Sequence, residues 1–201
     1  MVSNKIKSDF SDERLLVSGL KKGQEEAFRF LMRRYEKRLF NIAYGITLDR
    51  EESLDILQEV FLKVYQKIHT FKQEARLSTW LHRITVNVSL NWQRRWKRRF
   101  RWHHEPLEQD GHGEHRELGT NDHYPQSLLE KKEFEKTLWQ GLRALSDEAR
   151  AVFVLKELEG LSYEDIAKIL KIKRGTVSSR LFYARKALRA YLEPYLREQE
   201  D

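Results

Sequence analysis

The sequence has 201 residues and no cysteine. It can therefore form neither a disulfide bond nor a thiolate metal site, and a reducing compartment such as the cytoplasm is expected. The N-terminal stretch MVSNKIKSDFSDERLL carries charges every few positions and lacks the apolar run of a secretion signal. No stretch approaches the length that spans a bilayer, so we expect no membrane insertion.

Proline and glycine are scarce, with three and nine residues in the whole chain. So few breakers leave room for long helices, and apolar residues follow the helical period with no alternation of the β type. The pattern predicts helices over residues 12–23, 24–47 and 51–70, and a fourth that Thr79 caps. We expect a compact helical bundle whose inward positions are Leu15, Leu16, Leu20, Phe28, Leu31, Tyr35, Leu39, Ile42, Ile46, Leu57, Phe61, Val64, Ile68, Trp80, Leu81, Ile84, Val88 and Trp92.

The end of the fourth predicted helix is strongly basic, reading NWQRRWKRRFRW from Asn91. Trp92, Trp96 and Phe100 are four residues apart and share one helical face. Cations that neutralise phosphates and rings that stack on bases suit nucleic acid, which also fits the formal net charge of +7. The alternative is a basic helix whose rings pack on their own domain, although so dense a run of cations repels itself without a polyanion.

The composition changes abruptly after this helix. Residues 103–126 contain six acidic residues, two prolines, one arginine and no lysine, too little apolar surface to hold a fold. We therefore interpret 103–127 as a flexible linker between two helical domains, 1–102 and 128–201. Five histidines lie in it, at positions 103, 104, 112, 115 and 123. A metal site there is conceivable, but without cysteine or pre-organisation we interpret them as polar linker residues and expect no cofactor.

The second domain begins with a helix marked by apolar residues at Phe134, Leu138, Leu142 and Leu145. Ser146 is expected to cap a further helix, which ends at Gly160 because glycine readily adopts the left-handed conformation. Together with the two helices of the next stretch, these form a four-helix domain.

Residues 161–192, LSYEDIAKILKIKRGTVSSRLFYARKALRAYL, predict two helices joined by a tight turn and closed by Pro194. Ser162 caps the first helix, with Asp165 three residues on. On the second helix, one side carries the apolar residues Val177, Leu181, Ala184 and Leu188. The other side carries Ser179, Phe182, Tyr183 and Lys186. The bland interpretation is an amphipathic hairpin with a solvated basic face, but serines and an aromatic on that face favour a DNA-binding helix-turn-helix.

The order of these parts resembles bacterial RNA polymerase sigma factors of the extracytoplasmic-function group. The resemblance covers nearly the whole chain and is carried by AFRFLMRRYEKRLFNIAYGIT, DILQEVFLKVYQKIHTF, STWLHRITVNVSLNWQRR, LKELEGLSYEDIAKIL and RGTVSSRLFYARKAL. It implies a protein without catalytic residues that binds core RNA polymerase and promoter DNA and is commonly held inactive by an anti-sigma factor. Lys171 stands in the turn where many helix-turn-helix proteins have glycine.

The resemblance also implies roles for single residues. Asp55, Gln58 and Glu59 of the D-x-x-Q-E-x-F signature would dock on the largest polymerase subunit. The minus-ten element would be read around the loop 72–78, which receives a flipped base, by Phe71, Trp80, Asn87, Asn91, Arg94 and Arg95. The minus-thirty-five element would be read by Ser178, Ser179, Phe182 and Tyr183, with phosphate contacts from Lys156, Arg174, Arg180 and Lys186.

Two other classes of function compete with this one. A stand-alone helix-turn-helix regulator would bind duplex DNA tightly as a dimer, but no heptad seam lies outside the predicted cores and the two-domain layout would have no role. A nuclease would need paired metal ligands, and although Asp55 and Glu59 are close in sequence, no metal-ligand motif or nucleophile accompanies them. We therefore expect a protein that is not an enzyme.

Overall fold

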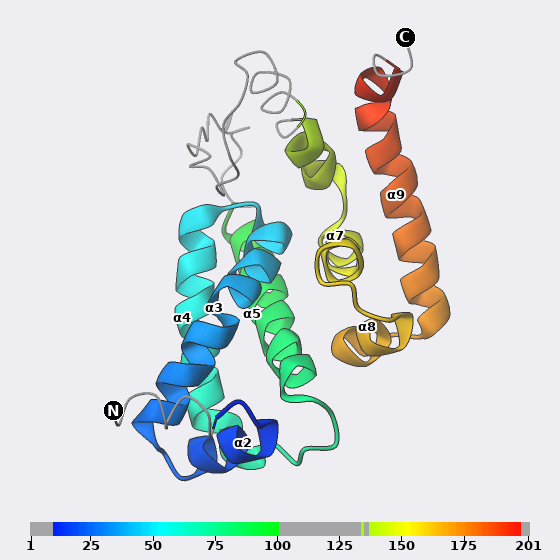
Figure 1. The fold of residues 1–201 in the computed structure, drawn as a ribbon. Helices are drawn as coiled ribbons and strands as arrows, with labels where there is room; N and C mark the ends of the chain where they lie inside the picture. Colours follow the sequence, from blue (N-terminus) through cyan, green and yellow to red (C-terminus); the bar gives the residue numbers. More distant parts are fainter. Residues whose placement is uncertain (1–9, 101–133, 135–136, 198–201) are drawn as a thin grey trace, which may run out of the picture.

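The computed structural model describes residues 10–100, 134 and 137–197 (Figure 1). These residues form helices and loops without a strand, which confirms the all-α class. The first half, residues 10–100, contains α2 (Glu13–Lys21), α3 (Glu25–Thr47), α4 (Arg50–Lys67), the 3₁₀ turn η1 (Ile68–Thr70) and α5 (Leu77–Phe100). The second half, residues 137–197, contains a helical segment over 137–144, then α7 (Asp147–Phe153), the π-helical turn η2 (Val154–Leu158), α8 (Tyr163–Leu170) and α9 (Arg174–Arg197). The predicted linker and its histidines lie outside the described residues.

The core of the first half is made by α3, α4 and α5, which pack against one another. Leu31, Leu39 and Ile42 are completely buried, so the predicted stripe of α3 is confirmed. The prediction for Leu15 is wrong, because its side chain is 53% exposed. The short helix α2 turns Leu16, Val17 and Leu20 inward, and Leu15 falls outside that narrow face.

Helix α5 begins at Leu77, two residues before the predicted cap Thr79. The N–H of Leu77 donates to a carboxylate oxygen of Glu13 at 2.8 Å, so a side chain of α2 satisfies one of the free donors at the start of α5. The cap therefore comes from a residue distant in sequence, and a local pattern could not reveal it.

Local signals did place the helices of the second half. The hydroxyl of Ser146 accepts from the N–H of Ala149 at 3.3 Å, and that of Ser162 accepts from the N–H of Asp165 at 3.1 Å, as predicted. Gly160 has the expected positive φ, at 63°. Lys171 adopts a similar left-handed conformation, with φ 55°, in the turn between α8 and α9. Pro194 does not close α9, which continues to Arg197; the proline lies in its last turns.

The two halves are in contact (Figure 1). Helix α3 packs against α7 and η2, and α5 packs against α7 and α8. Buried residues of the first half, such as Leu39 and Val86, belong to one hydrophobic cluster with Leu155 and Ile166 of the second half. Helices α4 and α9 lie on opposite sides of the molecule.

Candidate nucleic-acid interface

The outer face of α9 combines serines with two large aromatic rings. Phe182 and Tyr183 are 63% and 66% exposed, and Ser178 and Ser179 beside them are exposed as well. The apolar side of the helix is buried as predicted, at Val177, Leu181, Ala184 and Leu188. Large apolar groups left in water indicate a surface that binds something.

The cations around this face differ in how they are held. Lys156 donates to the carbonyl of Leu161 at 3.2 Å and lies over the ring of Tyr163. Arg174 forms an ion pair with Glu164 at 3.0 Å. Among the described residues no ion pair joins Arg180 or Lys186. Of the four predicted phosphate contacts, Arg180 and Lys186 are therefore the ones with uncommitted charge.

Arg185, a further cation beside the apolar side of α9, lies one turn from Leu181. Its Nη2 and Nε atoms donate to one carboxylate oxygen of Glu157 at 2.6 and 3.0 Å, and this hydrogen bond raises the pKa of Arg185. The pair ties α9 to η2.

The basic end of α5 presents several of the predicted minus-ten residues. Asn87, Asn91, Arg94 and Arg95 are all exposed. Asn91 accepts a hydrogen bond from Arg94 at 3.2 Å, and Arg95 lies 3.7 Å from Glu59. Trp92 and Trp96 stack with their ring centres 6.4 Å apart, and Trp92 packs against the hydrophobic core. Trp92 therefore follows the alternative raised by the sequence, in which a ring of the basic helix packs on its own domain.

The loop between η1 and α5 corrects one expectation. Phe71 is only 4% exposed, and its ring lies 5.2 Å from that of Trp80. Because Phe71 is buried at the start of the loop, it supports the loop from within and offers no surface to a base. Residues 72–76 are exposed, and Gln73 has a positive φ of 60°.

Helix α4 carries the predicted polymerase contacts on its outer side. Asp55 and Gln58 are exposed, whereas Glu59 is partly buried and pairs with Lys63 at 3.0 Å. Burial, followed by the nearby Asp49 and Asp55 charges, raises the pKa of Glu52 at the start of this helix.

Three large apolar residues of α4 that the sequence analysis passed over share this outer side. Leu54, Leu62 and Tyr65 are 44%, 56% and 62% exposed. With Gln58 they follow spacings of four, four and three, which places them on one stripe. The signal was present in the sequence as a second stripe beside the predicted core stripe of this helix, about a quarter-turn away from it. We call Leu54, Asp55, Gln58, Leu62 and Tyr65 the α4 face.

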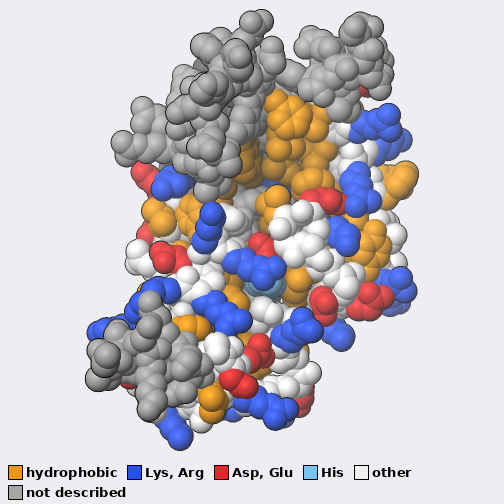
Figure 2. Space-filling model, viewed as in Figure 1, with side chains coloured by type: hydrophobic (Ala, Val, Ile, Leu, Met, Phe, Trp, Pro, Cys, Tyr) orange, Lys and Arg blue, Asp and Glu red, His pale blue; other side chains and the backbone are white. Residues whose placement is uncertain are grey.

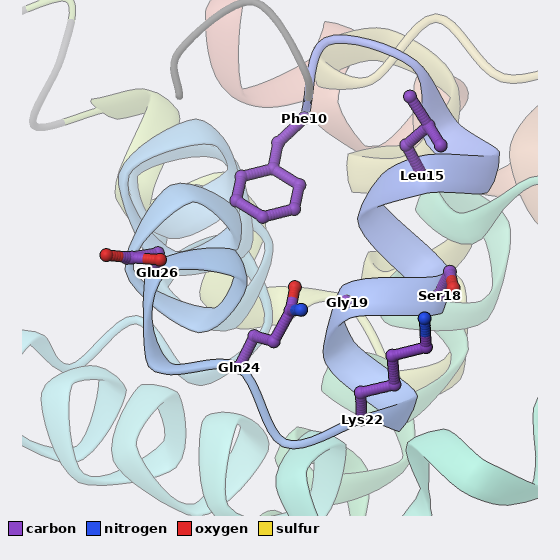
Figure 3. A pocket seen from close by; sticks show the side chains of 7 residues that line it. All are labelled: Phe10, Leu15, Ser18, Gly19, Lys22, Gln24 and Glu26. Carbon is purple, nitrogen blue, oxygen red and sulfur yellow. The ribbon is translucent and has the colours of Figure 1, made fainter. Parts of the chain in front are cut away.

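Two further features of the surface provide no additional candidate site. A hollow of about 500 Å³ lies between α2 and the start of α3, where Gln24 points between Phe10 and Gly19 (Figure 3). On the face that Figure 2 shows, Lys and Arg side chains are interspersed with acidic ones and form no single basic patch. Within the described ranges there is no group of acidic and histidine side chains that could hold a metal ion, and no helix long and apolar enough to cross a membrane.

Comparison with known proteins identifies the family. Residues 31–99 match the family model for sigma-70 region 2, and residues 136–188 match that for sigma-70 region 4. The RNA polymerase sigma-H factor of Pseudomonas aeruginosa is 33% identical over 189 residues, which cover 91% of this chain and 95% of that protein. The ECF RNA polymerase sigma-E factor of Escherichia coli K12 is 30% identical over 195 residues, 92% of this chain and 96% of that protein. The chain belongs to the extracytoplasmic-function sigma factors.

Solved structures agree with the fold of this sigma factor. A structure of CnrH in complex with the cytosolic domain of CnrY matches with a TM-score of 0.63 at 21% identity, covering 90% of this chain and 97% of CnrH. The sigma factor RpoE of Bartonella quintana, solved with the anti-sigma factor NepR, matches with a TM-score of 0.59 at 25% identity, covering 83% of this chain and 96% of RpoE. Sigma factors are transcription initiation factors.

Proposed function

We propose that this sigma factor binds core RNA polymerase in the cytoplasm and directs initiation at promoters with a minus-ten and a minus-thirty-five element. The observation that carries the proposal is the outer face of α9, where Phe182 and Tyr183 stay more than half exposed beside two serines. A helix built only for solubility would present charged residues there. On a helix-turn-helix, this face reads base edges in the major groove through hydroxyl groups and apolar contacts.

For the minus-ten element we propose Asn87 and Asn91 as base-reading residues. They are one helical turn apart on the exposed side of α5, and an amide offers one donor and one acceptor to a base edge. Arg94 and Arg95 supply positive charge for the adjacent phosphates. Phe71 and Trp80 keep the neighbouring loop in shape, and that loop receives the flipped base.

For core polymerase we propose the α4 face. Its exposed leucines and tyrosine supply apolar area, while Asp55 and Gln58 supply the polar contacts that fix register. Glu59 contributes less directly, because it is paired with Lys63 and lies near Arg95.

We further propose control by an anti-sigma factor. The two solved relatives described above were captured with the cytosolic domain of CnrY and with the anti-sigma factor NepR. The shared fold and near-complete coverage support the same mode of regulation for this chain.

Run-off transcription with purified components tests the proposal. Neither the sigma factor nor core polymerase alone should give a transcript from a cognate promoter, and the mixture should give one start site. A stand-alone regulator would instead bind the duplex without polymerase, with a Kd of about 10⁻⁸ M or tighter. Tight duplex binding together with no core-dependent transcript would reject the sigma-factor mechanism.

A further inference from the structure

The two halves share one hydrophobic cluster, and one buried carboxylate lies in the contact between them. Glu159, which directly follows η2, is 5% exposed at its side chain and forms an ion pair with Arg38 of α3. Nη2 of Arg38 also donates to the Glu159 carbonyl at 3.4 Å. A carboxylate this buried depends on its partner, because an unpaired buried charge is strongly unfavourable. The Arg38 side chain is 47% exposed and keeps contact with water.

A second polar link joins the halves at the other end of the contact. Lys97, from the basic run of α5, forms an ion pair with Asp147 at the start of α7, at 2.7 Å. Asp147 also accepts from Arg150 at 2.9 Å, and Arg150 donates to the Leu142 carbonyl at 3.1 Å. Burial lowers the pKa of Arg150, and Asp147 opposes that effect. The link therefore ties a half-exposed cation of the basic run of α5 to the second half of the chain.

The backbone of α3 also lies close to a side chain of η2 in this contact. A Cβ atom placed on Gly45 of α3 would lie 2.7 Å from a Val154 methyl group and 3.5 Å from the Val154 Cβ atom. Val154 opens η2, and π-helical turns of this kind are frequently found at functional sites. Glycine at position 45 is what allows η2 to approach α3 this closely.

His82 of α5 lies inside the same contact. Its side chain is 1% exposed, and neither ring nitrogen has a hydrogen-bond partner among the residues that the structure describes. Nε2 lies 3.9 Å from the Glu159 carboxylate. Burial, and then the Arg38 charge, lower the pKa of His82 to about 4, so the imidazole is neutral here. Unpartnered buried nitrogens are costly, which makes this residue a weak point of the contact.

The inference rests on the proposed function, because it compares the size of the closed molecule with the distance between the two promoter elements. A compact chain of 201 residues has a radius of gyration of about 17 Å and thus a diameter of about 43 Å. The centres of elements at minus ten and minus thirty-five are about 25 base pairs apart, or about 85 Å at about 3.4 Å per base pair. The two halves must separate before one molecule can read both elements.

We propose that the contact between the halves is an autoinhibitory latch, held by Arg38 and Glu159 and released more easily when His82 takes up a proton. In the open form the imidazole returns to water, while Lys97 becomes available to DNA. No partner protein is required for the closed form, since all the groups that hold it belong to this chain.

The direction of the pH effect follows from the groups around His82. Arg38 of α3 and Glu159 beyond η2 face it; on α8, which also packs against α5, Glu164 and Lys168 are exposed and Asp165 is bonded to Ser162. Because the pKa in the closed form lies below the ordinary value of 6.5, closure is favoured above pH 6.5 and weakens as the pH falls toward 4. With these two values the ratio of open to closed molecules should rise about tenfold from pH 7.5 to 5.5.

The absence of native cysteine allows a direct distance measurement. Donor and acceptor dyes are attached to cysteines that replace Gln66 and Arg189, two exposed positions on α4 and α9, the helices that lie on opposite sides of the molecule. Glu159→Gln should lower energy transfer by opening the latch, whereas Glu164→Gln, which breaks an ion pair within the second half, should not. In the unaltered latch, acidification should lower transfer, and His82→Leu or His82→Gln should abolish that pH dependence. Equal transfer in both glutamine variants, or the same pH profile without His82, would overturn the proposal.

A cross-link tests whether opening is required. In Gly45→Cys/Val154→Cys the Cβ atoms would be about 3.5 Å apart, within the range of disulfides, and loss of the valine methyl groups relieves the crowding. The oxidised protein should be at least tenfold less active in core-dependent transcription than the reduced protein, and Gly45→Ala/Val154→Ala should be insensitive to oxidation. Failure of the disulfide to form, or full activity of the oxidised protein, would contradict the latch. If no form gives a core-dependent transcript, the proposed function fails, while energy transfer still decides whether the latch exists.

Discussion

At the scale of single residues, Asn87 is the group on which promoter melting most depends in this account. Its amide is exposed on α5, and among the described residues no hydrogen bond engages it. A bidentate amide contact to a base is worth about 1–3 kcal/mol, so Asn87→Ala should reduce open-complex formation by about fivefold or more. Permanganate reactivity of the melted strand measures this.

Binding of core polymerase supplies the control for that variant. Asn87→Ala should bind core as tightly as the wild-type protein, because the α4 face is unchanged. Ser18→Ala, at an exposed position of α2, should alter neither property. Normal melting by Asn87→Ala would remove Asn87 from the base-reading set.

Glu13 illustrates a residue whose role only the fold reveals. Because its carboxylate caps α5 through the N–H of Leu77, Glu13→Ala should destabilise the protein by about 1 kcal/mol, the usual cost of a lost cap. Glu13→Gln retains an acceptor oxygen and should lose less. Urea denaturation of the two variants measures the difference, and identical midpoints for Glu13→Ala and wild type would argue against the cap.

The sequence predicted correctly those residues whose role depends only on their neighbours in the chain. Ser146, Ser162 and Gly160 act on backbone groups within a few residues, and the α3 stripe is set by helical period alone. Phe71 was misjudged because its burial depends on Trp80 packing over it after the chain has folded. The contact of His82 with Glu159 joins residues far apart in sequence, and no local pattern encodes it.

At the scale of elements, the α4 face and the α9 face do different work. Leu62 is 56% exposed and contributes little to the core, so Leu62→Ala should leave the thermal unfolding midpoint nearly unchanged. Burying a leucine in an interface contributes about 1.5–3 kcal/mol, so the same change should weaken core binding about tenfold or more. Fluorescence titration with core polymerase measures this.

Leu15→Ala is the matched control for the α4 face. Leu15 is similarly exposed, at 53%, but lies on α2. If Leu15→Ala and Leu62→Ala weakened core binding equally, the α4 face would not be the specific binding surface for core polymerase.

On the second half, the cations of the helix-turn-helix should separate into two kinds. Lys186 has no partner among the described side chains. Lys186→Ala should therefore weaken duplex binding by the holoenzyme, and the slope of log K against the logarithm of the salt concentration should become less steep by about 1. Lys156 already bonds to the Leu161 carbonyl, so Lys156→Met should lower stability and leave the slope unchanged. Binding measured over a range of salt concentrations tests both, and a reversed result would mean that Lys156 turns outward to the phosphate.

At the scale of the whole molecule, the sequence predicted two helical DNA-reading units but not their contact. Each unit has its own periodic signal, whereas the contact depends on Arg38, Lys97, Glu159 and the small residue at Gly45, whose partners lie in the other half. The exposed faces of α4 and α9 survive this closure, so the closed molecule keeps both surfaces accessible while fixing the distance between them.

Footprinting of the reconstituted holoenzyme on a cognate promoter tests whether one molecule reads two separate promoter elements. We expect two protected segments about 25 base pairs apart, with permanganate-reactive thymines only at the downstream one, and neither signal without core polymerase. A single protected duplex segment that forms equally well without polymerase would contradict it.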